Sequence, residues 1–166
     1  MNIDFSADEV FEMAEQIERN GARFYRRAAE GVLHSGERRM FLELAGMEQN
    51  HERVFASMRE ELSTSDRTAA AFDPQGEGAL YLRAMADGHV FDPKADPVDF
   101  FKDQHTQRDI LKKALDLEKD SVIFYLGIKE VVPERLGKGR IEEIIKEEMR
   151  HIVFLNGELT ARGPSG

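Results

Sequence analysis

No cysteine occurs among the 166 residues of this chain, and this absence excludes several kinds of chemistry. Disulfides, Fe–S clusters, zinc sites built from thiolates and thiolate catalysis all require a residue that the sequence does not have. Any metal ion must therefore be held by Glu, Asp and His side chains. The sequence has 32 acidic residues and five histidines from which such a site could be built.

The sequence also lacks a basic stripe and a long apolar run. Its formal net charge is -9 and its pI is about 5.1, so we expect no nucleic-acid partner. No apolar run is long enough to cross a bilayer, and the opening MNIDFSADEV has neither the basic nor the apolar part of a signal peptide. We therefore expect a soluble, cytoplasmic protein with no membrane partner, and its length suits one domain over residues 1–166.

Clusters of glycine, proline and β-branched residues that would bound strands are missing, whereas helical periodicity is strong. The periodicity predicts long helices at 6–30, 37–62, 106–132 and 139–161. Residues 63–105 mix turn signals with a short amphipathic piece, so we expect short helices in this crossover. The expected fold class is all-α, a four-helix bundle of two antiparallel hairpins joined by a long crossover.

Each predicted helix has one seam of apolar residues spaced three and four apart, and polar side chains interrupt each seam near its middle. These interruptions recur at an offset of 100 residues, so the chain is predicted to be a tandem repeat of one hairpin. The repeated pairs are Glu18 and Glu118, Tyr25 and Tyr125, Glu48 and Glu148, and His51 and His151.

The spacing also predicts how deep these residues lie in the bundle. Glu18 and Glu48 are equally far from residue 33 in the first turn, and Glu118 and Glu148 are equally far from Pro133 in the second. An antiparallel hairpin brings each pair level, roughly 22 Å from its turn at about 1.5 Å per residue. Both hairpins should therefore place their polar residues in one central layer.

Four carboxylates in an apolar core need compensating charge, because a buried unpaired charge is strongly destabilising. Two divalent cations would balance four glutamates, and neutral imidazoles would add nitrogen ligands. The E-x-x-H spacing places Glu48 and His51, and likewise Glu148 and His151, one turn apart on one helix face. One such match is weak, but two matches on core seams, each 30 residues after a seam glutamate, predict a di-metal site.

This arrangement resembles the ferritin-like di-iron carboxylate superfamily. Its E-x6-Y spacing in both hairpins, together with EQNH and EMRH, is similar to the rubrerythrin-like branch. The resemblance covers roughly residues 6–62 and 106–161 and implies two Fe ions, with Mn or Zn possible in their place, bridged by Glu48 and Glu148. The implied metal ligands are Glu18, Glu48, His51, Glu118, Glu148 and His151.

Two features depart from the rubrerythrin pattern. Rubrerythrins typically carry a rubredoxin domain whose cysteine-held iron feeds electrons to the di-iron site, so this cysteine-free chain is expected to use a separate electron-donor protein. Peroxidase-type members also have a further carboxylate one turn beyond the ligand of the third helix, where this chain has Ser121, mirrored by Gly21. These small residues would either leave space for peroxide or O2 or only allow close packing.

Other polar residues near the seams are given different roles. Tyr25 and Tyr125 follow their glutamates by seven residues, and we expect each hydroxyl to hydrogen-bond a ligand carboxylate and hold its orientation. The alternative is that both tyrosines are only large core residues. Glu15 could add a ligand but is favoured as a solvated side chain, and off-seam glutamates such as Glu147 are expected to be mostly surface charges.

The leading functional interpretation is a non-haem di-iron oxidoreductase of rubrerythrin-like type, which reduces hydrogen peroxide or O2 with electrons from a separate donor. Two alternatives are a ferroxidase or iron-binding ferritin-like protein, and a dimanganese catalase, because Glu and His ligands do not discriminate iron from manganese by spacing. A bundle with a purely structural metal is a third. A homodimer is expected from the resemblance and from apolar residues off the seam, such as Ile152 and Phe154.

Overall fold

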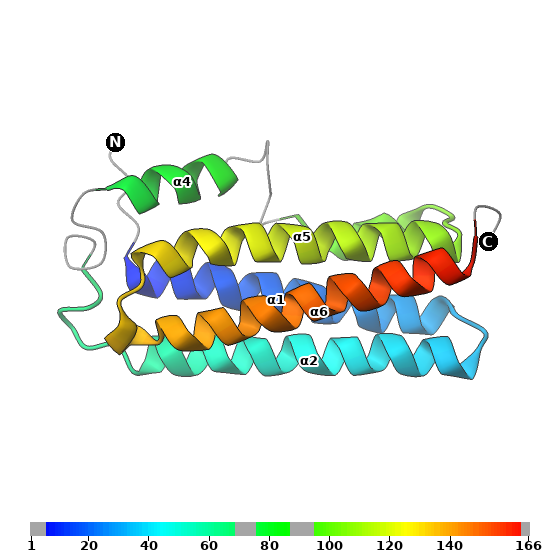
Figure 1. Ribbon diagram of the computed structural model, residues 1–166, viewed down its shortest axis with the longest axis horizontal. Coiled ribbons are helices and arrows are strands. Elements are labelled where there is room, and N and C mark those ends of the chain that lie inside the picture. Colours follow the sequence, from blue (N-terminus) through cyan, green and yellow to red (C-terminus); the bar gives the residue numbers. More distant parts are fainter. Residues whose placement is uncertain (1–5, 69–75, 87–94, 164–166) are drawn as a thin grey trace.

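The computed structural model describes residues 6–68, 76–86 and 95–163, and within these ranges it contains helices and no strand. Figure 1 shows two antiparallel helical hairpins lying side by side along their whole length. This confirms the predicted all-α four-helix bundle. The four long helices are α1 (Ala7–Gly31), α2 (Ser35–Glu60), α5 (Gln107–Val131) and α6 (Lys138–Ala161).

The helix ends lie within two residues of the predicted bounds, and local sequence explains them. Ser6 and Glu9 form a capping box before α1, and Thr106 and Asp109 form one before α5, so both helices begin one residue later than predicted. The start of α2 was placed too late, because the serine and glycine before residue 37 are accommodated in its first turn. Leu62 was placed inside α2 but follows it, and it stays buried against the core.

The crossover contains the short helices that were expected, α4 (Glu77–Ala86) and the 3-10 helix η1 (Pro97–Lys102). η1 packs on α1, and α4 packs on α5. At the second contact the ring of Tyr81 lies so close to Gly127 that a Cβ there would overlap it, and the Tyr81 hydroxyl donates to the carbonyl of Ile123 at 2.8 Å. The described helices of the crossover are therefore fixed to the outside of the bundle, and Leu82 and Met85 of α4 join one of its apolar clusters.

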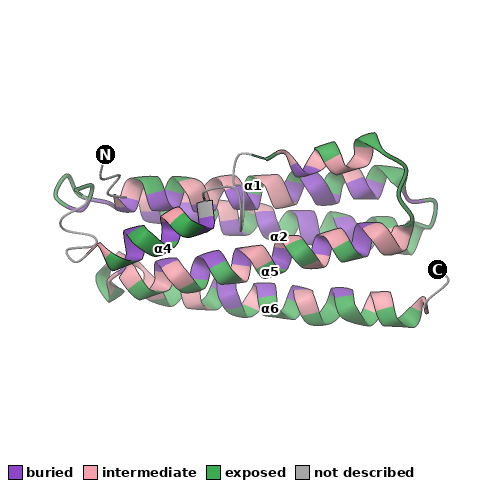
Figure 2. Ribbon diagram, turned by 90° about the horizontal axis from the view of Figure 1, so that it is seen from above, coloured by how far each residue is buried: buried purple, intermediate pink, exposed green. Residues whose placement is uncertain are grey.

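The interior consists of two apolar clusters separated by a polar layer. One cluster includes Phe11, Phe55 and Ile128, and the other includes Phe41 and Leu155. Figure 2 shows buried residues recurring along the inward side of each long helix, with exposed residues on the outer side. Because apolar packing closes both ends of the bundle, the layer between the clusters is shielded from water along the bundle axis.

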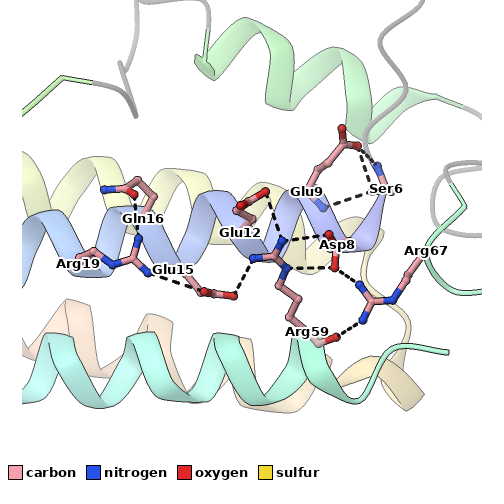
Figure 3. Close-up of polar contacts among 9 residues, drawn as sticks. All are labelled: Ser6, Asp8, Glu9, Glu12, Glu15, Gln16, Arg19, Arg59 and Arg67. Atoms are coloured by element: carbon pink, nitrogen blue, oxygen red, sulfur yellow. Dashed lines mark hydrogen bonds and ion pairs between the residues drawn. The ribbon is translucent and has the colours of Figure 1, made fainter. Parts of the chain in front are cut away.

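An ion cluster joins α1 to α2 near the start of α1 (Figure 3). The Arg59 guanidinium donates to both carboxylate oxygens of Asp8, at 3.0 and 3.1 Å, and also lies 3.4 Å from Glu12 and 3.6 Å from Glu15. Arg67 donates to Asp8 as well. The hydrogen bonds from Arg59 lower the pKa of Asp8, whereas burial raises the pKa of Glu15. Glu15 is thus mostly buried in an ion cluster rather than solvated, and it does not approach the central layer closely enough to join it.

None of the helices in the part of the chain that the structure describes is both long enough and apolar enough to cross a membrane.

Replacing Arg59 with alanine should lower the free energy of unfolding by about 1–2 kcal/mol, because one guanidinium forms ion pairs with three carboxylates, one of them largely buried, and offsets part of their repulsion. Urea unfolding of the metal-free protein measures the change. The control is Lys146→Ala, which breaks an exposed pair with Glu143 and should lower the stability much less. Equal effects of the two substitutions would show that the cluster does not stabilise the hairpin.

Candidate metal centre

The structure brings all six residues of the predicted ligand set into the central layer. Each of the four long helices contributes one glutamate, and α2 and α6 each add a histidine one turn after it. The six side chains are at most 3% exposed, although all are polar. They are Glu18, Glu48, His51, Glu118, Glu148 and His151.

The donor atoms of these residues fall into two overlapping groups. In each group one atom from every residue lies within 4.8 Å of the others, which is the spacing of ligands around one cation. The first group adds Glu18 and His51 to a shared pair, and the second adds Glu118 and His151. The shared pair is Glu48 and Glu148. Two carboxylates common to two groups of donors have the composition of a di-metal site with bridging carboxylates.

Several donor atoms of the layer have no hydrogen-bond partner within the described residues. They include one oxygen of Glu18, one of Glu48, both of Glu148, and the Nδ1 atoms of His51 and His151. Buried polar atoms are normally satisfied, and unsatisfied ones cost about 1–3 kcal/mol each. Unpartnered atoms converging from α1, α2 and α6 fit cations between them, since a cation would satisfy several of them at once.

Both histidines turn Nδ1 toward the carboxylates. Nδ1 of His51 lies 2.9 Å from Glu148 and 3.4 Å from Glu18. Nδ1 of His151 lies 2.8 Å from Glu148 and 3.4 Å from both Glu48 and Glu118. The two rings are nearly parallel, with centroids 6.0 Å apart. Nδ1 is therefore the nitrogen that each ring offers to a metal, and Nε2 faces away.

The two tyrosines connect the hairpins crosswise. The hydroxyl of Tyr25 on α1 donates to Glu118 on α5, and the hydroxyl of Tyr125 on α5 donates to Glu18 on α1. The hydrogen bonds expected from the E-x6-Y spacing are thus present, but each runs to the glutamate of the opposite hairpin. Burial, followed by the charge of the neighbouring glutamates, raises the pKa of both hydroxyls well above the usual value, so they remain protonated donors.

Burial and mutual repulsion raise the pKa of three carboxyl groups of the layer, those of Glu18, Glu48 and Glu148. Burial, together with the charge of Glu148, raises the pKa of Glu18 to about 7. Burial, together with the charges of Glu48 and Glu118, raises the pKa of Glu148 to about 8. Burial acts to lower the pKa of each histidine, but the adjoining carboxylates outweigh it and raise the pKa of His51 and His151 to about 12. Without a metal, the layer therefore retains protons at neutral pH.

One residue in contact with the layer was not singled out from the sequence. Glu147, expected to be a surface charge, lies 2.6 Å from Nε2 of His51. It was missed because it is next to Glu148 and off the apolar seam of α6. The signal that would have found it is the repeat itself, since position 47 carries methionine where position 147 carries glutamate.

Gly21 and Ser121 border a partly open cavity of about 420 Å³ between α1, α5 and residues 95–100, with Tyr25, Glu48 and Glu118 also in its lining. Gly21 has a second role, because a Cβ there would lie 2.7 Å from Oε2 of Glu48. The two expectations for Gly21 thus hold together: the missing side chain borders open space and also makes room for a glutamate of the layer.

Comparison with known proteins identifies the fold. The structure is similar to the crystal structure of a Thermotoga maritima protein provisionally described as a ferritin-like diiron-carboxylate protein, with a TM-score of 0.72. The superposition covers 96% of this chain and 98% of that chain at 20% sequence identity. The fold is therefore ferritin-like. No protein-family model matches the sequence, and no curated protein matches it.

Replacing Gly21 with alanine should displace the Glu48 carboxylate and weaken metal binding by about tenfold or more, the effect of disturbing a ligand's orientation. The stability of the metal-free protein should not fall, because alanine favours the helix and the displaced atom is the end of a flexible side chain. Fe²⁺ titration under anaerobic conditions and urea unfolding measure the two effects. Gly31→Ala on the same helix, where a Cβ meets nothing within 4 Å, is the control and should bind metal normally.

The metal-free protein should become less stable as the pH rises from about 5.5 to about 8.5. The pKa of Glu18 is raised to about 7, that of Glu148 to about 8 and that of His51 to about 12, so the folded protein binds these protons more tightly than the unfolded chain does. The stabilisation is complete below the unfolded-state pKa values and is lost as the pH rises through the folded-state ones. Thermal unfolding at a series of pH values measures this loss of stability. With divalent metal the trend should reverse, because protons compete with the metal. A flat profile without metal would contradict the raised pKa values.

Proposed function

We propose that the central layer binds two metal ions and that the protein is a di-iron oxidoreductase of rubrerythrin-like type. It would reduce hydrogen peroxide, or O2, with electrons from a separate donor protein. The observation that carries this proposal is the pair of donor groups that share Glu48 and Glu148. The E-x6-Y spacing in both hairpins favours the rubrerythrin-like branch over other di-iron carboxylate proteins.

The residues present fit two divalent cations. Four carboxylates carry four negative charges, which two such ions balance, and the unpartnered oxygens and Nδ1 atoms would each gain a bond. Glu18 and His51 would hold one ion, Glu118 and His151 the other, and Glu48 and Glu148 both. This donor set of oxygen and imidazole suits iron or manganese, and it also accommodates zinc. Two ferrous ions, when bound, would supply the two electrons that reduce one hydrogen peroxide, with two protons, to two waters.

The chain's own residues would orient the ligands and exclude water. Tyr125 holds one oxygen of Glu18, which leaves the other oxygen, 3.4 Å from Nδ1 of His51, directed into the layer. Tyr25 orients Glu118 by donating to the oxygen that also lies 3.4 Å from Nδ1 of His151. The apolar clusters on both sides exclude bulk water from the centre. The cavity beside Gly21 and Ser121 would admit a small oxidant, because its volume exceeds that of one water by more than tenfold.

A ferroxidase, in which Fe²⁺ is the substrate, is the second candidate function. Ser121 stands where peroxidase-type members of the rubrerythrin-like branch have a further carboxylate, and its hydroxyl donates to the carbonyl of Leu117 at 3.1 Å rather than to the layer. The two donor groups contain the same residue types, three glutamates and one histidine each, and this also suits binding and oxidation of iron as a substrate or its storage. A dimanganese catalase remains the third candidate because the donor atoms are the same.

We also propose a homodimer. Ile152 is half-buried, whereas the next two side chains of α6, Val153 and Phe154, are 73% and 45% exposed. Covering such side chains is favourable at roughly 25 cal/mol per Å² of apolar surface. Sedimentation measures the oligomeric state: a dimer would support the proposal, a monomer would contradict it, and a large shell would favour iron storage.

Anaerobic loading with Fe²⁺ should give two irons per chain, and stopped-flow absorbance should show oxidation of this iron by added peroxide faster than by O2. Two protein carboxylates shared between two ions make this stoichiometry the expected one. Glu48→Ala should lose at least one iron, because it removes a ligand common to both donor groups. Glu43→Ala, an exposed glutamate on the same helix, should keep both irons.

The outcomes separate the candidates. Faster oxidation by O2 with release of Fe³⁺ would favour the ferroxidase. Disproportionation of peroxide by the Mn²⁺-loaded protein but not by the Fe²⁺-loaded protein would favour the catalase. Iron that stays ferrous with both oxidants would contradict the di-iron peroxidase and the ferroxidase, and full iron content in Glu48→Ala would contradict the ligand assignment.

A further inference from the structure

The repeat that makes the two donor groups alike is broken in the residues around them. At the ligand positions the two hairpins match residue for residue at an offset of 100. Behind the histidines they differ: Nε2 of His51 is hydrogen-bonded to Glu147 at 2.6 Å, whereas the equivalent position on α2 is Met47. Nε2 of His151 is buried, and no described residue offers it a hydrogen bond. The two imidazoles are therefore chemically different.

The contact with Glu147 has a defined effect on His51. A carboxylate only accepts hydrogen bonds, so Nε2 of His51 must carry the proton. The neutral ring then has its lone pair on Nδ1, the atom that faces Glu18 and Glu148. A carboxylate behind a metal-ligating histidine fixes its tautomer and ring orientation and makes it a stronger donor, and losing such a partner typically costs about 10- to 100-fold in metal affinity.

Glu147 also adds negative charge on the side of one donor group. Its side chain is 36% exposed, so the charge is partly screened, but it lies one imidazole ring away from the His51 position. Met47 brings no charge to the His151 position, and its own side chain is 41% exposed. The negative charge of Glu147 and its hydrogen bond to His51 thus both favour a cation in the His51 position.

The cavity lies on the side of the other position. Its lining includes Glu118, which belongs only to the donor group of His151, and Glu48, which belongs to both. Neither Glu18 nor His51, the two residues specific to the first group, lines it. A small ion or molecule that enters the layer from this cavity would meet the His151 position first.

We propose that the two metal positions are unequal: the position built on His51 and supported by Glu147 holds its ion tightly, and the position built on His151 exchanges its ion through the cavity. This inference rests on the proposed di-metal function. The tightly held ion would hold α1, α2 and α6 in register, and the exchangeable ion would be the one in contact with substrate. Glu147 is a positioning residue in this scheme, because it acts through His51.

The test is an anaerobic Fe²⁺ titration of the metal-free protein by equilibrium dialysis with metal analysis. Wild-type protein should bind two ions in two steps that differ by about tenfold or more in affinity. A chelator added to the loaded protein should remove one ion quickly and the other slowly. Glu147→Ala should weaken the tighter ion by about 10- to 100-fold and accelerate the slow release phase. Glu143→Ala, one turn earlier on α6 and paired only with Lys146 among the described residues, is the matched control and should match wild type.

A second variant tests the proposal by adding a carboxylate instead of removing one. Met47→Glu places a carboxylate where the repeat predicts a partner for Nε2 of His151, at a position exposed enough to accept a charge. It should tighten the weaker ion by about tenfold or more and slow the fast release phase. This variant keeps the proposal testable if Glu147→Ala folds poorly.

Failure of the inference and failure of the proposed function give different results. Two ions of equal affinity, unchanged by Glu147→Ala and by Met47→Glu, would overturn the inequality while leaving the di-metal function intact. Weakening by Glu147→Ala of the ion that is already the weaker one would overturn the assignment of the tight position. No stoichiometric binding of any ion by wild-type protein would overturn both.

Discussion

The burial of four carboxylates and two imidazoles in one layer is the constraint on which the rest of the structure depends. Apolar clusters close the layer on both sides, so water cannot screen the charges along the bundle axis. Either protons or cations must then compensate them. The raised pKa values of Glu18 and Glu148 and the unpartnered oxygens of Glu148 are two consequences of the same shortage of positive charge. Proton binding and cation binding are alternatives at this layer, and each would stabilise the fold by compensating the buried negative charge.

The hairpin repeat meets this constraint by geometry rather than by local sequence. Arms of equal length on either side of each turn bring Glu18 level with Glu48 and Glu118 level with Glu148. The crosswise hydrogen bonds from the tyrosines then connect the hairpins, because each hydroxyl holds the glutamate of the other half. Neither hairpin alone contains a complete donor group, since each group draws on both. The layer is therefore assembled only when the hairpins dock, and metal ions bound there would add to the stability of the folded bundle.

The fold and the six residues of the layer could be predicted from the sequence because both follow from periodicity. A polar residue on an apolar seam must lie inside the bundle, and its distance from the turn defines its depth along the bundle axis. Glu147 could not be found this way, since a residue beside the seam faces a neighbouring helix, and its reach to His51 depends on the packing of α2 against α6. The cavity also could not be predicted from the sequence. One of its walls comes from residues 95–100, and helical periodicity does not specify where this segment packs on α1. Helical periodicity predicts which residues lie inside the bundle, but it does not predict which residues and cavities surround the polar layer.

Internal repetition gives the layer its symmetry, and the departures from repetition differentiate its two ends. Identical ligands from the two halves cannot by themselves make one metal position differ from the other, so any difference must come from the surroundings. Two separate departures act in the same sense here. The position without a carboxylate behind its histidine is the one that the cavity reaches, and the position with Glu147 behind His51 is remote from the cavity. Exchange of a metal ion requires both weaker binding of the ion and a route to solvent, and either feature alone would permit little exchange. Their occurrence at the same position is the reason to regard the asymmetry as functional rather than as a loss of symmetry in packing.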